Sequence, residues 1–526
     1  MKRVIAGGEV IDGTARAAQR CDVFVQDGAI TEVRPAADHH PGWQVIDASG
    51  LTIAPGFIDV HSHADVVPFL EEHDTSKILQ GITTEVVGNC GISAAPVTPE
   101  RSDALRRVLD RLMPDSSFPG SSFADFLTAA DARGYVTNYA PLVGHTTLRI
   151  AAMGAEKRAP TVSELALMES LLESSLDAGA FGLSSGLIYA PGAFADTEEL
   201  VSLAKHLHPN TLYTTHMRSE GDALLEAVHE ALEIGKRAGV RVEISHHKAA
   251  GRRNWGKTAA SLRAIEAARA NGQEVFHDVY PYTAGSTMLV TLLPPQAHDG
   301  GDEAILRRLE DPAEIARLRA IAEGDQGDFE NFIVMAGYDN IVIAGTASGN
   351  FEGLTLREAA RQLGMAEFDA LAHILRTEKL RAAMVIFMMD EADIERVLKD
   401  PHTTIGTDGL PPGFGGKPHP RTFGTFPRVI ARYVRERGIL SLEEAIHKMT
   451  ALAAQIFRIP DRGRIAPGFV ADLVAFDAAR ICDDLDYNDP VRYPTGIHWV
   501  MQRGEIAVEN GAYLGIRRGT RLRPAS

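Results

Sequence analysis

Residues 211–248 read TLYTTHMRSEGDALLEAVHEALEIGKRAGVRVEISHHK and contain two strands with the helix that joins them. Residues 211–218 and 240–248 are short apolar runs typical of buried strands. Between them, residues 222–239 carry apolar side chains at helical spacing and end at a glycine. A strand, a helix and a second strand in this order predict two parallel strands with the helix packed against them.

The same alternation extends in both directions along the chain. Residues 161–179 predict another helix, with Thr161 and Glu164 at the spacing of a capping box and Gly179 as its end. Nine segments are strand candidates: 57–63, 83–89, 136–145, 180–187, 211–218, 240–248, 274–282, 382–389 and 403–409. Eight parallel strands with covering helices predict an α/β fold, a (β/α)8 TIM-like barrel. The surplus candidate is assigned to the long irregular stretch of about residues 285–385.

The two ends of the chain differ from this middle part. Both contain short strands separated by turn residues, as in "CDVFVQDGAITEV" and "WVMQRGEIAVENG". We therefore expect residues 1–54 and 466–526 to form one small β-sandwich domain beside a barrel of residues 55–465. Within the barrel, residues 285–350 are expected to be an insertion that forms a lid over its mouth.

Composition restricts the class of protein. The chain has 526 residues, of which 45% are hydrophobic and 23% charged, as in folded globular proteins. Its three cysteines are too few for a disulfide framework and indicate a reducing compartment. We found neither a signal peptide nor an apolar run of about 18 residues, so a cytoplasmic protein without a membrane partner is expected. The net charge of −17 argues against nucleic acid as a partner.

Potential metal ligands follow the predicted strands. His61 and His63 alternate on one strand, so both side chains can share a face. Other strand ends supply further ligands: Cys90, His216, His246 and Asp408. A lone histidine near a strand end is more often a structural residue, which is our interpretation of His39, His40, His73 and His229. Six residues at the same end of barrel strands predict a shared site, and nitrogen and sulfur ligands suit zinc.

Several long motifs resemble the D-aminoacylase branch of the amidohydrolase superfamily, the N-acyl-D-amino-acid deacylases. The motifs are "PGFIDVHSHAD", "VGNCGIS", "GLSSGLIYAPG", "THMRSEG", "ISHHKAAG", "DVYPYTAGST", "IGTDGLP", "HPRTFGTFPRV" and "GRIAPGFVADLVAFD". They span nearly the whole chain. The resemblance implies a zinc-dependent amidohydrolase that acts on a linear amide.

The resemblance also implies roles for the ligands. In this branch a cysteine takes the place that a carboxylated lysine or a glutamate has in many relatives. Cys90, His216 and His246 are expected to hold one zinc ion tightly. His61, His63 and Cys90 are expected to form a second, weaker site. We prefer His246 to His247 because the ligand follows the serine of "ISHHK" directly.

A mechanism follows from these expectations. Zinc lowers the pKa of water towards about 7 and polarises a carbonyl. Asp408 is expected to take the proton of the water and pass it to the leaving amine. Lys248 and Tyr282 are expected to bind the carboxylate of the substrate, with Arg218 as an additional cation. Tyr189 is expected to line the acyl side.

The side chain of the substrate is predicted from residues 288–295. This segment reads MLVTLLPP and offers no arginine, which favours hydrophobic or neutral D-amino acids. An N-acyl-D-glutamate or N-acyl-D-aspartate deacylase is the alternative within the branch. A cyclic amidohydrolase of the hydantoinase or dihydroorotase kind is disfavoured, because residues 180–187 lack the lysine that such enzymes usually carboxylate. A non-catalytic barrel that only binds a ligand is a remote alternative, since all six ligand positions are present.

Overall fold

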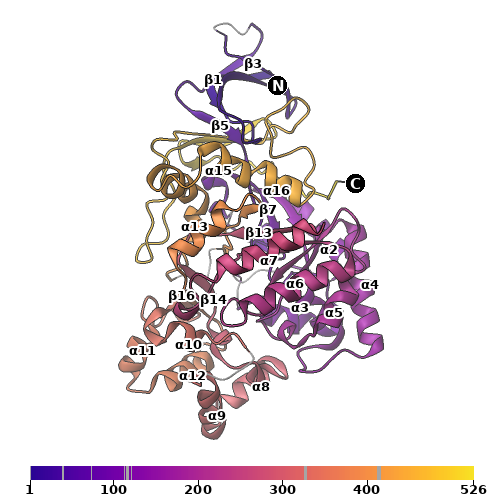
Figure 1. Cartoon of the computed structure of the whole chain (residues 1–526), viewed down its shortest axis with the longest axis vertical. Helices are drawn as coiled ribbons and strands as arrows, with labels where there is room; N and C mark the ends of the chain where they lie inside the picture. Colours follow the sequence, from indigo (N-terminus) through magenta and orange to yellow (C-terminus); the bar gives the residue numbers. More distant parts are fainter. Residues whose placement is uncertain are drawn as a thin grey trace.

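The computed structural model describes residues 2–37, 41–72, 74–111, 113, 118–119, 121–324, 329–411 and 416–525. In this part of the chain, a small sheet with the N-terminus lies at one end of the molecule, a barrel follows, and a group of short helices lies at the opposite end (Figure 1). Three of the structural histidines named above, His39, His40 and His73, lie outside the described residues, and His229 is exposed on a helix. No helix among the described residues is long and apolar enough to cross a membrane.

Eight parallel strands form the barrel, which confirms the predicted fold. In chain order they are β6 (Phe57–Asp59), β7 (Ile82–Val87), β8 (Asn138–Pro141) continued by β9 (Val143–Gly144), β10 (Gly182–Gly186), β11 (Leu212–His216), β12 (Arg241–Ile244), β13 (Val275–Val279) and β17 (Thr403–Ile405). Neighbours from β6 to β8 and from β9 to β17 pair in parallel. The barrel closes where Asp408 N donates to His61 O at 2.7 Å and His63 N donates to Gly409 O at 3.2 Å.

Helices cover the outside of the barrel. The helix α6 (Leu224–Ala238) buries the apolar side that the sequence predicts, including Leu224, Val228 and Ile234. The helix α4 (Val162–Ala178) starts at the predicted capping box and ends at Gly179, whose φ of 110° suits glycine. The remaining helices of this layer are α1 (Ser102–Leu109), α2 (Phe123–Arg133), α3 (His145–Met153), α5 (Thr197–Ala204), α7 (Thr258–Ala270), α13 (Glu391–Lys399), α14 (Arg421–Arg428), α15 (Leu442–Met449) and α16 (Ala451–Ile456).

The surplus strand belongs to an insertion between β13 and β17. The strand β16 (Ala382–Phe387) pairs in antiparallel fashion with β14 (Ala284–Met288) and β15 (Ile341–Thr346). The segment is not irregular, because five helices also form in it: α8 (Gly301–Arg308), α9 (Pro312–Ala322), α10 (Phe332–Ala336), α11 (Leu356–Leu363) and α12 (Glu367–Thr377). These helices are too short for a clear apolar period. The lid at 285–350 stays a prediction, and residues 325–328 lie outside the described part.

Both ends of the chain build one sheet. Its strands are β1 (Lys2–Val10), β2 (Gln19–Gln26), β3 (Ala29–Pro35), β4 (Gln44–Asp47), β5 (Thr52–Pro55), β18 (Leu473–Phe476), β19 (Ile497–Gln502), β20 (Glu505–Glu509) and β21 (Ala512–Tyr513). The antiparallel pairing of β5 with β18 joins the N-terminal strands to the C-terminal ones. The end of the chain then leaves the sheet and returns to the barrel, where Thr520 O accepts from Tyr139 N at 3.0 Å.

Candidate metal centre

The predicted ligands lie at one end of the barrel, just after the strands that carry them. His216 is the last residue of β11, and the other five follow β6, β7, β12 and β17 by two to four residues. All six side chains are buried. Three of them have left-handed backbone: φ is 52° at Cys90, 36° at His246 and 49° at Asp408. Such φ values cost free energy in residues other than glycine and tend to occur at functional sites.

Cys90 lies at the centre of the cluster. Its Sγ is 3.3 Å from Nε2 of His61, 3.5 Å from Nε2 of His246 and 3.7 Å from Nδ1 of His216. The ligand atoms form two groups, and within each group all of them lie within 4.8 Å of one another. One group consists of His61, His63, Cys90 and Asp408, and the other of Cys90, His216 and His246. The structure thus brings together all six residues that the sequence predicts, and the thiol is common to both groups.

Two carboxylates that the sequence analysis did not assign orient the histidines. Asp278 Oδ2 is 3.1 Å from Nδ1 of His61, and Glu220 Oε1 is 2.9 Å from Nδ1 of His246. A carboxylate on the far nitrogen of a histidine fixes its tautomer, and leaves the other nitrogen free to bind a metal. Both acids stand in motifs quoted above, "DVYPYTAGST" and "THMRSEG", but only the fold shows which histidine each one reaches.

Arg421 is a further residue that the sequence analysis missed. Its guanidinium forms an ion pair with Asp408, with Nη1 and Oδ2 2.7 Å apart, and lies 4.7 Å above the ring of Tyr280. Its Nη2 also donates to Ser286 O at 3.0 Å. The side chain is only 2% exposed. A buried cation therefore stands directly behind the predicted general base.

The electrostatics of the cluster favour a cation at its centre. Burial disfavours the thiolate of Cys90, but the positive fields of His61 and His246 outweigh burial and hold the pKa of Cys90 well below its ordinary value. Burial lowers the pKa of His61, but the charges of Asp278 and Cys90 overcome it and raise this pKa well above the ordinary value. Burial lowers the pKa of His216, which keeps this imidazole neutral. Anionic sulfur beside imidazole nitrogen is a donor set that suits zinc.

The predicted substrate-binding residues lie at different places around the cluster. Lys248 lies beside it, and its Nζ is 2.8 Å from Nδ1 of His246 and also contacts Glu220. Tyr189 packs its ring 5.1 Å from the ring of His216. Tyr282 instead packs on His419, with ring centroids 5.2 Å apart, while Tyr280 comes 6.4 Å from the ring of His246.

Arg218 is occupied by other partners. Its guanidinium pairs with Glu230 at 2.8 Å and donates to the carbonyl oxygens of Ala193 and Ala195. This arrangement is that of a structural ion pair, which also binds η4 (Gly192–Phe194) and the residue that caps it. A role of Arg218 in substrate binding stays a prediction.

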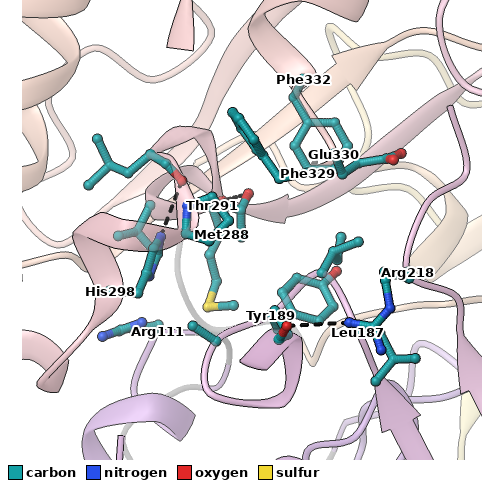
Figure 2. Close-up of a pocket in the computed structure, with 16 residues that line it drawn as sticks. Arg111, Leu187, Tyr189, Arg218, Met288, Thr291, His298, Phe329, Glu330 and Phe332 are labelled. Atoms are coloured by element: carbon teal, nitrogen blue, oxygen red, sulfur yellow. Dashed lines mark hydrogen bonds between the residues drawn. The ribbon is translucent and has the colours of Figure 1, made fainter. Parts of the chain in front are cut away.

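A cavity of about 70 Å³ opens beside Tyr189 (Figure 2). Much of its wall is apolar, from Leu187, Met288, Val290, Leu293 and Phe332. Met288, Val290 and Leu293 come from the segment MLVTLLPP.

The arginines of this wall pair with carboxylates, and its histidine and glutamate have pKa values that burial shifts away from the charged form. Arg111 pairs with Asp302, and Arg218 pairs with Glu230. Burial lowers the pKa of His298 to about 4. Burial, followed by the charge of Glu220, raises the pKa of Glu330 to about 7.

Comparison with known proteins gives consistent similarities. The family described as "Amidohydrolase family" matches residues 44–508. The chain is 39% identical to an N-acyl-D-aspartate deacylase of Alcaligenes xylosoxydans xylosoxydans, over 95% of this chain and 91% of that one. It is 37% identical to a D-aminoacylase of the same organism, over 98% of this chain and 96% of the relative. An N-acyl-D-glutamate deacylase from Bordetella bronchiseptica, solved with zinc and a phosphonate inhibitor, superimposes with a TM-score of 0.83 at 35% identity, over 99% of both chains.

Proposed function

The chain belongs to the amidohydrolase family, and from this premise we propose that it is a zinc-dependent deacylase that hydrolyses N-acyl-D-amino acids to a carboxylate and a free D-amino acid. The observation that carries the proposal is the cluster of four histidines, one thiol and one carboxylate at the mouth of the barrel. Active sites of such barrels lie at this end. The relatives named above, which act on N-acyl-D-amino acids, support the substrate class.

Two groups of residues would hold zinc. We propose that Cys90, His216 and His246 hold one ion tightly and that His61, His63 and Cys90 hold a second one more weakly. When bound, zinc supplies a Lewis acid for the amide carbonyl and lowers the pKa of water towards about 7. The buried thiolate and the neutral imidazole of His216 are the donor types that such an ion requires.

Asp408 is proposed as the general base and acid. Its Oδ1 is 3.1 Å from Nε2 of His63, so the carboxylate faces the cluster. Burial opposes ionisation of Asp408, but Arg421 and His61 hold the pKa of the carboxyl well below its ordinary value. The ionised carboxylate can accept one proton from the attacking water and deliver it to the amide nitrogen as the C–N bond breaks.

The carboxylate of the substrate needs a cation near the cluster. We propose Lys248 and Arg421 for this role, because the ammonium of Lys248 lies beside His246 and the guanidinium of Arg421 lies beside Asp408. Tyr280 is close to both cations, 5.4 Å from Nζ of Lys248 and 4.7 Å from the guanidinium of Arg421. Tyr282 and Arg218 stay predicted contacts, because the ring of Tyr282 packs on His419 and the guanidinium of Arg218 pairs with Glu230.

Arg421→Met tests this assignment. Hydrogen bonds to charged groups contribute roughly 1.5–3 kcal/mol, so kcat/KM should fall about 10- to 150-fold. Arg462 is a buried arginine that pairs with Asp472 at 3.0 Å, away from the cluster. Arg462→Met is the matched control and should change kcat/KM less than twofold. Equal values for the two variants would remove Arg421 from the site.

We propose that the apolar cavity beside Tyr189 receives the side chain of the substrate, and not the acyl group that the sequence analysis expects there, which supports a preference for neutral, hydrophobic D-side chains. A carboxylate placed there would lie near Glu330, whose pKa of about 7 leaves it partly ionised at neutral pH, and Arg111 and Arg218 already neutralise acids of their own. Burial of an uncompensated charge costs several kcal/mol, so acidic substrates should be disfavoured roughly tenfold or more. We expect zinc-loaded protein to hydrolyse N-acetyl-D-leucine and N-acetyl-D-methionine faster than the D-glutamate and D-aspartate derivatives, and to leave all L-enantiomers intact.

Assays of these substrates side by side provide the measurement. Faster turnover of the D-glutamate or D-aspartate derivative would contradict the hydrophobic preference and leave the deacylase chemistry in place. Turnover of hydantoin or dihydroorotate, with no turnover of linear amides, would contradict the proposed function itself.

All three cysteines are free thiols, which supports the cytoplasm as the compartment that we propose.

A further inference from the structure

Lys77 is a fully enclosed cation inside the barrel. Its side chain is 2% exposed, and it comes from the segment just before β7. The Nζ donates to Asp59 Oδ2 at 2.9 Å, to Ser62 Oγ at 2.9 Å, to Thr407 Oγ1 at 2.9 Å and to Glu85 Oε1 at 3.2 Å. Burial disfavours the ammonium, but Asp59 and Glu85 outweigh burial and raise the pKa of Lys77, so it is charged at neutral pH.

Three of the four partners of Lys77 lie on the two strands that close the barrel, and the fourth, Glu85, lies on β7, the strand that leads to Cys90. Asp59 and Ser62 belong to β6 and the residues after it, and Thr407 follows β17. Asp59 Oδ1 accepts from the backbone N–H of His61 at 3.2 Å and from that of Thr407 at 2.8 Å. The hydroxyl of Thr407 donates to the other oxygen of Asp59 at 2.6 Å and accepts from Gly409 N at 3.0 Å. A single polar network therefore spans the seam between the first and last strands.

The network includes residues that are sequence neighbours of three proposed site residues. Ser62 stands between His61 and His63, and Thr407 directly precedes Asp408. Asp408 has φ at 49°, a strained conformation that its surroundings must hold. His216 and His246 belong to β11 and to the residue pair after β12, and Lys77 contacts neither strand.

We propose that Lys77 is a positioning residue that holds the strand ends of His61, His63 and Asp408 in register across the seam of the barrel. The inference rests on the proposed function, because the three residues matter as ligands and as a base. Loss of the ammonium would leave Asp59 and Glu85 as buried carboxylates without their shared cation, and such charges repel. Ser62 and Thr407 would lose the donor that they share, so the ends of β6 and β17 would lose a link across the seam. The strand β7 would keep its pairing with β8 and the hydrogen bond of Thr137 to Glu85, so the group of Cys90, His216 and His246 would keep its geometry.

Lys77→Met tests the proposal, with zinc affinity of the apo protein as the first readout. Titration against a chromophoric chelator measures each zinc-binding step without an assay of activity. Replacement of a residue that orients metal ligands typically lowers the metal affinity or the activity by about 10- to 100-fold. We expect the weaker zinc step to lose about tenfold or more in affinity and the tighter step to stay unchanged. In the zinc-loaded variant, kcat should fall about tenfold or more, with KM within about twofold of the wild-type value.

Arg462→Met is the control for a loss of stability alone. Arg462 is a buried cation paired with Asp472 at 3.0 Å, next to the small sheet and away from the cluster. Both variants should lower the free energy of unfolding, because removal of one partner of a buried ion pair typically costs about 3–5 kcal/mol. Only Lys77→Met should change the weaker zinc step and kcat.

Substitutions of Thr407 provide a second test, which can be carried out even if the Lys77→Met variant does not fold. Thr407→Val has nearly the same shape but lacks the hydroxyl that bonds Lys77, Asp59 and Gly409, whereas Thr407→Ser retains it. The valine variant should weaken the same zinc step and lower kcat, and the serine variant should restore both. Wild-type zinc affinities and kcat in the Lys77→Met and Thr407→Val variants would overturn the inference. A wild-type protein that binds no zinc would instead overturn the proposed function, and the inference with it.

Discussion

Replacement of Cys90 by alanine is expected to lower kcat/KM by on the order of 10³-fold or more, because Cys90 is common to both groups of proposed ligands. Its Sγ lies within 3.7 Å of a nitrogen of His61, His216 and His246. A metal ion contributes several kcal/mol to the stabilisation of a hydrolytic transition state, and about 4 kcal/mol corresponds to 10³-fold. Zinc content after dialysis and kcat/KM on the best N-acyl-D-amino acid are the two measurements.

The control for this variant is Cys21→Ala. Cys21 is a buried thiol in the small sheet, where burial raises its pKa, so it behaves as a small apolar side chain. The control should retain zinc and activity. Stoichiometric zinc and full activity in Cys90→Ala would show that the thiol is no ligand.

Asp408→Asn is expected to lower kcat by about 10²- to 10⁴-fold, with zinc content retained. An amide cannot accept the proton of the attacking water, but it has almost the same shape as the carboxylate. The group of Cys90, His216 and His246 does not include Asp408, so the tighter zinc ion should remain bound. Single-turnover rates, KM and zinc content of the purified variant provide the comparison.

Asp393→Asn is a matched substitution outside the cluster. Asp393 is 2% exposed in α13, and its carboxylate accepts from Gly256 N at 2.7 Å and from the hydroxyl of Thr258. Its replacement should lower stability and leave kcat of the folded protein unchanged. A kcat for Asp408→Asn near that of Asp393→Asn would assign the proton transfer to another group.

The barrel could be predicted from the sequence because local pattern and chemistry agree. Each of the six predicted ligands ends or follows a barrel strand, and the surplus run at 382–389 contributes none of the six. The predicted ligands meet because the carboxyl ends of parallel strands lie at one end of a barrel. His61 and His63 point to one site because alternate residues share a face.

The supporting residues were beyond sequence reasoning for a physical reason. Arg421 is the first residue of α14, and it contacts Asp408 in the folded protein. No helical or strand repeat in the sequence relates these two positions. Lys77 stands in the segment "SKILQG", which reads as an ordinary turn with one charged side chain. Contacts between a turn and the interior of a barrel depend on the closed fold, and no local pattern encodes them.

The pairing of β5 with β18 imposes an order of events on synthesis. The ribosome releases β5 when residues 52–55 emerge, but its partner β18 follows only at residues 473–476. At roughly 5–20 residues per second, this interval lasts about 20–80 s. During this time the edge of β5 that later pairs with β18 is free, and β5 is held only by its pairing with β1. A nascent chain stalled after Asp408 but before residue 473 therefore carries every proposed ligand while one edge of β5 is still open to a foreign partner.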